Sequence, residues 1–541
     1  MKKSIIITIA LFAVVAMPFT ACKKGLDYKP YYGLNAEAVY SDPENYVHVL
    51  AKIYGSFVLT GNQGPSGQPD ITGFDEGASG YIRVLWNLQE LPTDEAVCGW
   101  SDPGIPELHN LAWSSDNQWI KYMYYRIYFT VPMCNEFIRE SADSKLKDRG
   151  FSETERAKIA TFRDEARFVR ALAYSHIVDM FGGGPFITED DQPGAFNPPY
   201  KSRSEMFNYV ESELLAIEGS ITAARQAEYG HADKAAVWSL LAKLYLNAGV
   251  YTGTLRYADA RVYCEKVIAA GYSLETQYKN LFLADNNKSQ EIIFPITASG
   301  KNTQTYGCTS FLVHAALGGN MVGGTYGVSG TWAGLRTTPE FVSLFPDSTL
   351  DGRYLFYRSG QSLTLNDTSW VDNSNHSLGV KGLFLGTDFK FGYALPKYKN
   401  IKSTGGAGSD LNYVDIDFPM FRLADVYLMY AEAVLHGGGG NMGTAIGYLN
   451  ALRQRAYGNS SSDIGSYDDN YILAERGREL QWEATRRTDL IRFGKFAGSD
   501  YKWSWKGGEQ FGSSPASYIN LYPLPASDIA ANPNLTQNPG Y

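Results

Sequence analysis

The stretch EARFVRALAYSHIVDMFGGGPF, residues 165–186, decides the fold class of this sequence. From residue 162 onward, apolar side chains recur at steps of three and four, which places them on one helical face: Phe162, Ala166, Val169, Ala173, Ile177 and Met180. Three glycines and a proline at 182–185 then stop the helix. For His176, inside this helix, a packed or hydrogen-bonded core histidine is favoured over a catalytic base.

Further helices come in consecutive pairs. Helical periodicity indicates helices over Asp233–Asn247, Leu255–Ala270, Arg422–Leu435, Thr444–Tyr457 and Tyr471–Arg492. Asp233 is placed to cap the first of them and Gly249 to end it. A short turn joins the first helix to the second, and another joins the third to the fourth. Small and aromatic residues occupy the packing positions, so each of these two pairs is similar to a tetratricopeptide hairpin. The sequence predicts a mainly α fold built on such hairpins, with a few short strands.

Long irregular segments separate the helices. They cover Gly61–Gly80, Leu91–Trp119, Ser299–Thr338 and Arg358–Gly408 and are rich in Gly, Ser, Asn and Tyr. Loops of this length in a compact domain are usually functional or disordered, and their aromatic content argues against disorder. Tyr (38) outnumbers Phe (27) in the chain, which favours rings that keep one edge in water. We therefore expect a helical scaffold that carries functional loops.

The first residues have the pattern of a secretory signal. Met1–Lys3 is basic, Ile5–Met17 is apolar but shorter than the ~20 residues that span a bilayer, and Ala21 precedes Cys22. The Ala-Cys pair resembles a bacterial lipobox, which predicts that residues 1–21 are removed and that Cys22 carries a lipid. Cleavage beside a chance cysteine is the alternative. Residues 22–541 would then form one domain tethered to a membrane by lipid.

Charge and cysteine spacing argue against several classes of function. The formal net charge is −9 and no basic run suits a phosphate backbone, so nucleic acid is not expected as a partner. The remaining cysteines match no compact metal-ligand pattern, and buried free thiols are favoured over a disulfide: Cys98, Cys134, Cys264 and Cys308.

Motifs for catalysis are weak. The string GGGNMG at 438–443 fits a dinucleotide-binding pattern, but a helix rather than a strand precedes it, so a helix–helix turn is favoured. Glu479 and Glu483 stand four residues apart on the last helix, as a glycosidase pair could. The surrounding arginines, Arg478, Arg486, Arg487 and Arg492, would lower the pKa of both carboxylates, whereas a general acid needs a raised pKa. These acids are therefore interpreted as members of a structural ion-pair network.

Asp415-Ile416-Asp417 offers a candidate cation site. In an extended segment both carboxylates point to the same side, as a hard cation such as calcium prefers. Further oxygens would have to come from elsewhere, and Asp285, Asn286 and Asn287 are candidates. Two solvated acids before a helix are an equally good interpretation of the local pattern.

Three stretches of the sequence resemble the SusD/RagB family. They are Glu165–Phe186, Arg478–Phe496 (RELQWEATRRTDLIRFGKF) and the ending YPLPASDIAANPNLTQNPGY. The likeness extends over residues 22–541 and is greatest to the starch-binding members. It implies an outer-membrane, surface-exposed lipoprotein without catalytic activity. It also implies one helical domain, with four tetratricopeptide-like pairs, that binds glycans and delivers them to a SusC-like TonB-dependent transporter.

The resemblance also implies a set of site residues. Matching by local motif gives Arg83 after GASGYI, Trp100 at the end of PTDEAVCGW, Tyr306 in TQTYGCTSFLV and Trp332 in VSGTWAGL. Further polar contacts are implied for Asp102 and Asp75, and structural calcium for Asp415, Asp417 and Asp285. The sequence departs from the family pattern at Cys98, which stands where the family has a second tryptophan.

The chemistry of these side chains suits a sugar. Indole and phenol rings match the apolar C–H face of a pyranose, and Arg83 has donors for the hydroxyls at its rim. A curved set of rings would select a coiled α-1,4-glucan by shape. Two other functions stay open: a secreted glycoside hydrolase, and a structural lid or adaptor of the transporter that binds no glycan.

Overall fold

The computed structural model describes residues 36–191, 194, 196–319, 321–357, 389 and 392–541. The predicted signal segment 1–21, the lipidation site Cys22 and most of the predicted loop 358–408 before residue 392 therefore lie outside the described residues. The chain forms two compact units, residues 1–48 and 49–541, and the second unit contains the candidate site.

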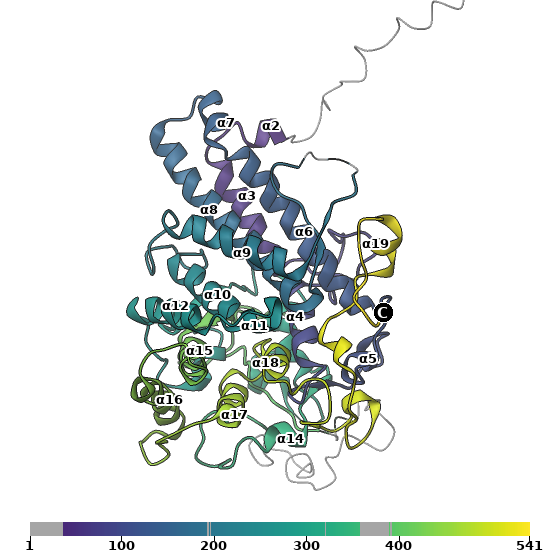
Figure 1. Ribbon diagram of the computed structural model, residues 1–541, viewed down its shortest axis with the longest axis vertical. Helices are drawn as coiled ribbons and strands as arrows, with labels where there is room; N and C mark the ends of the chain where they lie inside the picture. Colours follow the sequence, from purple (N-terminus) through teal and green to yellow (C-terminus); the bar gives the residue numbers. More distant parts are fainter. Residues whose placement is uncertain (1–35, 192–193, 195, 320, 358–388, 390–391) are drawn as a thin grey trace, which may run out of the picture. The chain divides into compact units, whose positions relative to one another are not determined.

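The described residues are mainly helical (Figure 1), as the sequence predicts. The helices are α2 (Ala36–Val39), α3 (Asn45–Gly55), α4 (Tyr81–Glu90), α5 (Ile105–His109), α6 (Gln118–Glu140), α7 (Asp143–Asp148), α8 (Glu153–His176), α9 (Arg203–Glu218), α10 (Lys234–Leu246), α11 (Ala248–Thr252), α12 (Tyr257–Ala269), α13 (Cys308–Ala315), α14 (Pro339–Val342), α15 (Leu423–Leu435), α16 (Met442–Tyr457), α17 (Asp469–Leu480), α18 (Arg486–Arg492) and α19 (Ala526–Ala531). None of the described helices is long and apolar enough to cross a membrane.

Helix α8 confirms the prediction made from its period. Ser152 and Glu155 form a capping box at its start, and the predicted face is buried from Ala166 to Met180. A short π-helical turn, Ile177–Phe181, continues the helix to Gly182, whose φ of 76° ends it.

The predicted helical pairs are present. Helix α10 packs against α12 and α15 against α16, while α6, α8 and α9 lie side by side (Figure 1). Asp233 caps α10 through the backbone N–H groups of Ala235 and Ala236, as expected. The predicted helix end at Gly249 is wrong, because Gly249 lies inside the next short helix, α11. That helix ends at Gly253, which has a φ of 77°. The glycine string at 438–443 spans the turn into α16, as expected, and the four cysteines at 98, 134, 264 and 308 are buried free thiols.

Three short antiparallel strand pairs complete the described structure. They are β1 (Val97–Cys98) with β5 (Leu335–Arg336), β2 (Gly184–Pro185) with β3 (Tyr200–Lys201), and β4 (Ile292–Ile296) with β6 (Phe418–Arg422). In the last pair Ile292 faces Arg422 and Ile296 faces Phe418, with irregular register between them. The first and last pairs bring together chain segments more than a hundred residues apart.

One predicted helix is broken. The helix expected over 471–492 divides into α17 and α18, because Trp482 and Ala484 both adopt φ of +59°. Buried bonds hold this turn: Trp482 donates its backbone N–H to the Glu95 carboxylate at 2.7 Å and its indole N–H to the Glu95 carbonyl at 2.9 Å. The carbonyl of Trp482 accepts the indole N–H of Trp86 at 3.0 Å. These tertiary bonds outweigh the local helical period.

The acids of this region belong to a buried ion-pair network, as predicted, but their partners are not the arginines nearest in sequence. Arg422 reaches Glu479 at 2.7 Å, Glu483 at 2.6 Å and Glu291 at 2.8 Å. The other members that surround them are Arg353, Arg455, Lys397, Glu475 and Asp351. Burial alone raises the pKa of a carboxyl, but the guanidinium groups of Arg455, Arg422 and Arg353 bring the pKa of Glu479 well below its usual range.

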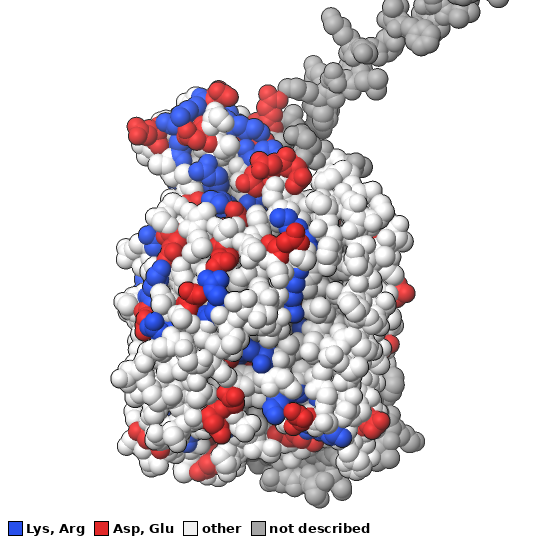
Figure 2. All heavy atoms as spheres, viewed as in Figure 1, with Lys and Arg blue, Asp and Glu red and all other residues white. Residues whose placement is uncertain are grey.

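Surface charges are mixed in sign. Figure 2 shows Lys and Arg next to Asp and Glu over the end formed by α7 and the start of α8. Lys147 and Arg156 both pair with Asp143 there, for example. At this end of the molecule the charges therefore do not form a field of a single sign.

Removing Arg422 tests the network. Arg422→Met leaves buried carboxylates without their shared cation, so we expect the free energy of unfolding to fall by about 3–5 kcal/mol. Lys147→Met, which removes a cation from an exposed pair, should change it far less, because solvent screens that pair. Guanidinium unfolding of both variants measures this, and equal losses would contradict the structural role of the network.

Candidate functional site

Three aromatic side chains that the sequence singled out lie together in the structure. Trp100 and Trp332 have ring centroids 6.5 Å apart, and Trp332 and Tyr306 have centroids 6.3 Å apart. All three are half-buried, so each ring keeps part of its surface in solvent. We refer to Trp100, Trp332 and Tyr306 as the aromatic platform.

Trp100 is fixed by close backbone contacts. Its indole N–H donates to the carbonyl of Trp332 at 3.0 Å, and the neighbouring Gly99 N–H donates to the carbonyl of Gly334 at 2.8 Å. A Cβ atom at Gly334 would lie 2.5 Å from the Trp100 ring, so only glycine leaves room for the indole. The ring therefore has one well-defined position at the surface.

Trp332 rests on a buried histidine. Its ring stacks on His314 with centroids 4.6 Å apart and an angle of 15° between the planes. The two ring nitrogens of His314 lie 2.8 Å from the Gly330 carbonyl and 3.0 Å from the Asn412 carbonyl. Burial lowers the pKa of His314, and the two carbonyl groups oppose this shift, so the ring is a buried, hydrogen-bonded support for the indole.

Arg83 lies next to the platform and is largely buried. Its side chain is buried, with the guanidinium carbon 4.3 Å from the Phe311 ring centroid and 5.6 Å from that of Trp100. One terminal nitrogen donates to the Gly77 carbonyl at 2.6 Å. Burial lowers the pKa of Arg83 to about 10, against the opposing effects of Cys98, Asp102 and Asp75. In this position Arg83 supports the rings, and its contact with sugar hydroxyls stays a prediction.

Asp75 and Asp102 are exposed at the edge of the site. One Asp75 oxygen accepts the Ala78 N–H at 2.7 Å, within a turn whose Gly77 touches the Tyr306 side chain. Asp102 follows Trp100 and is near enough to Arg83 to raise the pKa of its guanidinium, as Asp75 also is. Both carboxylates are therefore available to hydroxyl groups beside the platform.

The sequence analysis missed three side chains of this site: His314 and Phe311 below the rings, and Tyr413 beside Tyr306. The first two have the helical spacing of α13 and look like ordinary core residues. Tyr413 stands two residues before the Asp-x-Asp string in a Gly- and Ser-rich loop, the same type of setting that drew attention to Trp100 and Trp332.

The candidate calcium ligands are only partly brought together. Asp415 accepts the Gly300 N–H at 2.8 Å, and Asp417 accepts the Ala298 N–H at 2.9 Å. Asp285 bonds to Ser403 instead. Within the part of the chain that the structure describes, no three His, Cys, Asp or Glu side chains form a group that could hold a metal ion. The N–H groups aimed at these carboxylates fit a cation poorly, and the calcium site stays a prediction.

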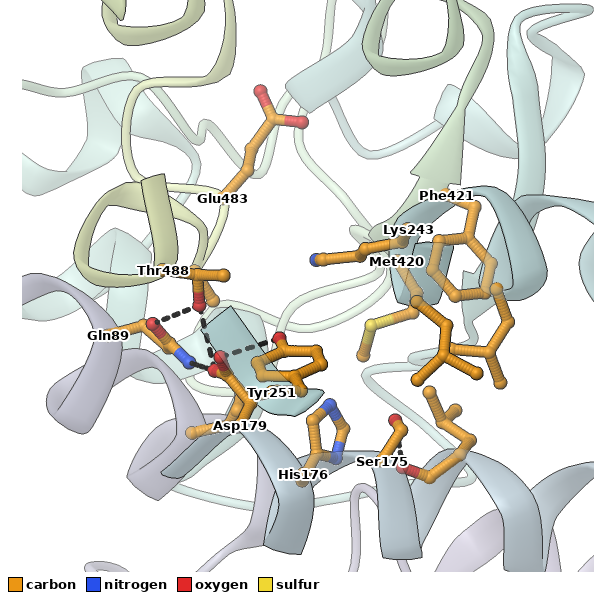
Figure 3. Close-up of a pocket in the computed structure, with 15 residues that line it drawn as sticks. Gln89, Ser175, His176, Asp179, Lys243, Tyr251, Met420, Phe421, Glu483 and Thr488 are labelled. Carbon is orange, nitrogen blue, oxygen red and sulfur yellow. Dashed lines mark hydrogen bonds between the residues drawn. The ribbon is translucent and has the colours of Figure 1, made fainter. Parts of the chain in front are cut away.

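A small interior cavity of about 40 Å³ lies between α8, α10 and the turn before α18 (Figure 3). His176 lines it and bonds to the Tyr81 hydroxyl at 2.7 Å, and burial together with Lys243 lowers the pKa of His176 to about 3. Asp179 accepts bonds from Gln89, Thr488 and Tyr251. These bonded side chains confirm the interpretation of His176 as a core residue.

One carboxyl pair does have raised pKa values. Burial raises the pKa of Glu90 to about 7, and burial and then the charge of Glu90 raise that of Glu95. Both side chains are fully buried, and their oxygens accept the backbone N–H groups of Thr485 and Trp482. The sequence analysis did not single out this pair, and burial keeps a substrate from reaching either group.

Filling the space under Trp100 tests the platform geometry. Gly334→Ala places a Cβ inside the indole, so we expect Trp100 to move and its bond to the Trp332 carbonyl to break. Gly330→Ala is the matched control in the same loop, because nothing lies within 4 Å of a Cβ there. Fluorine NMR of fluorotryptophan-labelled protein should show shifted Trp100 and Trp332 resonances in the first variant only.

Known proteins resemble this chain over nearly its whole length. A model of the SusD family matches residues 290–541. The chain is 36% identical to the starch-binding protein SusD of Bacteroides thetaiotaomicron over 98% of both chains, and 24% identical to a SusD-like protein of Bacteroides ovatus. Surface glycan-binding protein A of Bacteroides thetaiotaomicron, solved with laminarihexaose, shares the fold with a TM-score of 0.68 at 20% identity, over 92% of this chain and 99% of that one. Its fold, its motifs and the identity to SusD agree: this chain belongs to the SusD family.

Proposed function

We propose that this protein binds starch-type α-glucans at the cell surface and delivers them to a SusC-like TonB-dependent transporter. The observation that carries the proposal is the aromatic platform, whose rings are fixed and half-exposed. A full-length relative at 36% identity whose name describes starch binding adds support.

The orientation of the rings favours a curved ligand. The planes of Trp100 and Trp332 meet at 45°, and those of Trp332 and Tyr306 at 58°. A flat, extended glycan would need nearly coplanar faces, whereas each sugar of a coiled chain turns relative to the last. The rings offer apolar faces to the C–H surfaces of such sugars, and the exposed carboxylates of Asp75 and Asp102 offer acceptors to their hydroxyls.

Other parts of the proposal rest on the sequence alone. They are the removal of residues 1–21, a lipid on Cys22, an outer-membrane location and the transporter as partner. Calcium belongs here as well: if it binds at Asp415 and Asp417, EDTA should lower the melting temperature of the purified protein and added calcium should restore it. A melting temperature that ignores both reagents would remove calcium from the proposal.

The second candidate is a laminarin-type ligand, because a structural relative was solved with laminarihexaose. A β-1,3-glucan also curves, so ring geometry alone does not choose between the two. A secreted hydrolase is disfavoured because the raised-pKa carboxyls are buried, and release of reducing sugar from amylopectin would revive it. A lid that binds no glycan would leave the exposed rings without a role.

Native gel electrophoresis in starch tests the proposal. Wild-type protein should be retarded by starch, and Trp100→Ala and Trp332→Ala should run as in a gel without polysaccharide, because each loses a stacking face. Phe511→Ala is the control, since Phe511 is an aromatic side chain that is 84% exposed outside the platform. Retardation by laminarin alone would favour the second candidate, and unchanged mobility of both Trp variants would refute the platform.

A further inference from the structure

A polar pocket lies among the tetratricopeptide-like helices, and no residue of the aromatic platform lines it. It is bounded by the start of α12, the end of α15, the first turn of α17 and the end of α18, which pack against one another (Figure 1). Its volume is about 330 Å³, at the small end of the ~300–1,000 Å³ that small-molecule sites occupy. We refer to it as the hairpin pocket, and the argument about its ligand uses Tyr257, His436, Asp469, Asn470, Phe493 and Lys495.

The glycine-rich turn after α15 builds one wall of the hairpin pocket. A Cβ atom at Gly438 would lie 2.6 Å from the carbonyl oxygen of Tyr257, so only glycine lets the end of α15 lie against the start of α12. The Gly438 carbonyl also accepts a bond from Arg261 of α12 at 2.9 Å. His436, two residues earlier, stacks on Tyr257 with ring centroids 4.8 Å apart and 18° between the planes. The glycine string at 438–443 therefore has a structural role at this pocket.

Paired charges form another part of the lining. Arg492 donates to the two oxygens of the buried Glu432 at 2.5 and 2.9 Å. The Nε2 atom of His436 lies 3.2 Å from the Asp469 carboxylate. The two lining acids, Glu432 and Asp469, are balanced by the two lining bases, Arg492 and Lys495. Because the charges cancel, the pocket has no field of a single sign that would attract an ion, and it suits a neutral polar ligand.

Four polar groups that line the hairpin pocket have no hydrogen-bond partner among the described residues. They are the Tyr257 hydroxyl, the second carboxylate oxygen of Asp469, the Asn470 amide and the Lys495 ammonium. A sugar hydroxyl both donates and accepts, so it can bond to an acceptor such as the carboxylate, a donor such as the ammonium, or the amide, which is both. The rings of Tyr257 and Phe493 add apolar surface for the C–H groups of a sugar.

We propose that the hairpin pocket is a second carbohydrate site, which holds a single hexose unit independently of the aromatic platform. The inference goes beyond the proposed function, because the pocket and the platform share no residue. The hexose is either a free sugar or the end of a glycan chain, since both present the same ring and hydroxyl groups. Binding is weak, because a single sugar makes few contacts in a site that is open to water.

Saturation-transfer difference NMR with glucose tests the pocket in the Trp100→Ala variant, in which the platform has lost a stacking face. We expect saturation transfer to glucose in this variant. Adding Asn470→Leu or Lys495→Met should raise the dissociation constant for glucose about fivefold, as loss of one hydrogen bond implies. Asn302→Leu is the matched control, because Asn302 is an exposed asparagine that does not line the pocket. Melting temperatures report whether each variant folds.

The outcomes separate this inference from the proposed function. Absence of saturation transfer, or equal dissociation constants for the Asn470→Leu and Asn302→Leu variants, would overturn the pocket as a sugar site, whether or not starch retards the wild-type protein. Stronger transfer to acetate than to glucose would also overturn it, because the ligand would then be an anion. Maltotriose distinguishes the two sources of the hexose: a matching loss with Asn470→Leu supports a chain end, and a loss for glucose alone supports a free sugar.

Discussion

The charge cluster centred on Arg422 is the interaction on which the rest of the structure depends. The five N–H groups of Arg422 donate to Glu291 before β4, to Glu479 in α17 and to Glu483 in the turn that follows. Buried charged groups are tolerated only when each of them is paired. The segments that contribute these groups must therefore meet in one arrangement. A local shift of any segment would leave a buried charge unpaired, and the cluster thereby fixes the relative positions of helices and strands that are far apart in the sequence.

The aromatic platform is positioned from this core. Strands β4 and β6 pair with Arg422 at one end, and the opposite end leads into the segments of Tyr306 and Tyr413. The turn between α17 and α18 is joined to Glu95 by two hydrogen bonds that Trp482 donates. From Glu95 the chain continues through β1 to Trp100. Arg486 holds Asp94 at 2.8 Å, and the Asp94 carbonyl accepts the Thr338 hydroxyl near the segment of Trp332. Each ring is thus a short distance along the chain from a buried, fully bonded anchor.

Buried charge and exposed aromatic surface lie in different parts of the second unit. Paired charges keep Glu475 and Glu479 ionised, and Glu90 and Glu95, whose pKa values are raised, are buried in the interior. What reaches solvent at the platform is ring surface, with Asp75 and Asp102 beside it. The interior carries the charge that specifies the fold, and the surface carries the flat apolar faces that suit a sugar.

Local patterns in the sequence were enough for the helices, the Asp233 cap, the mainly α class and the aromatic loops, because period, capping and composition act within a few residues. They also indicated that Glu479 and Glu483 are ion-paired. The tertiary structure alone decided which cations they meet, since those come from Arg353, Arg422 and Arg455 far along the chain. Only the tertiary structure shows that the last predicted helix is broken at Trp482. It also shows that Arg83 is buried next to the aromatic platform and that Tyr413 lies beside Tyr306. The physical reason is the same in each case: buried hydrogen bonds and ring contacts between distant segments outweigh local preference, and no local period records them.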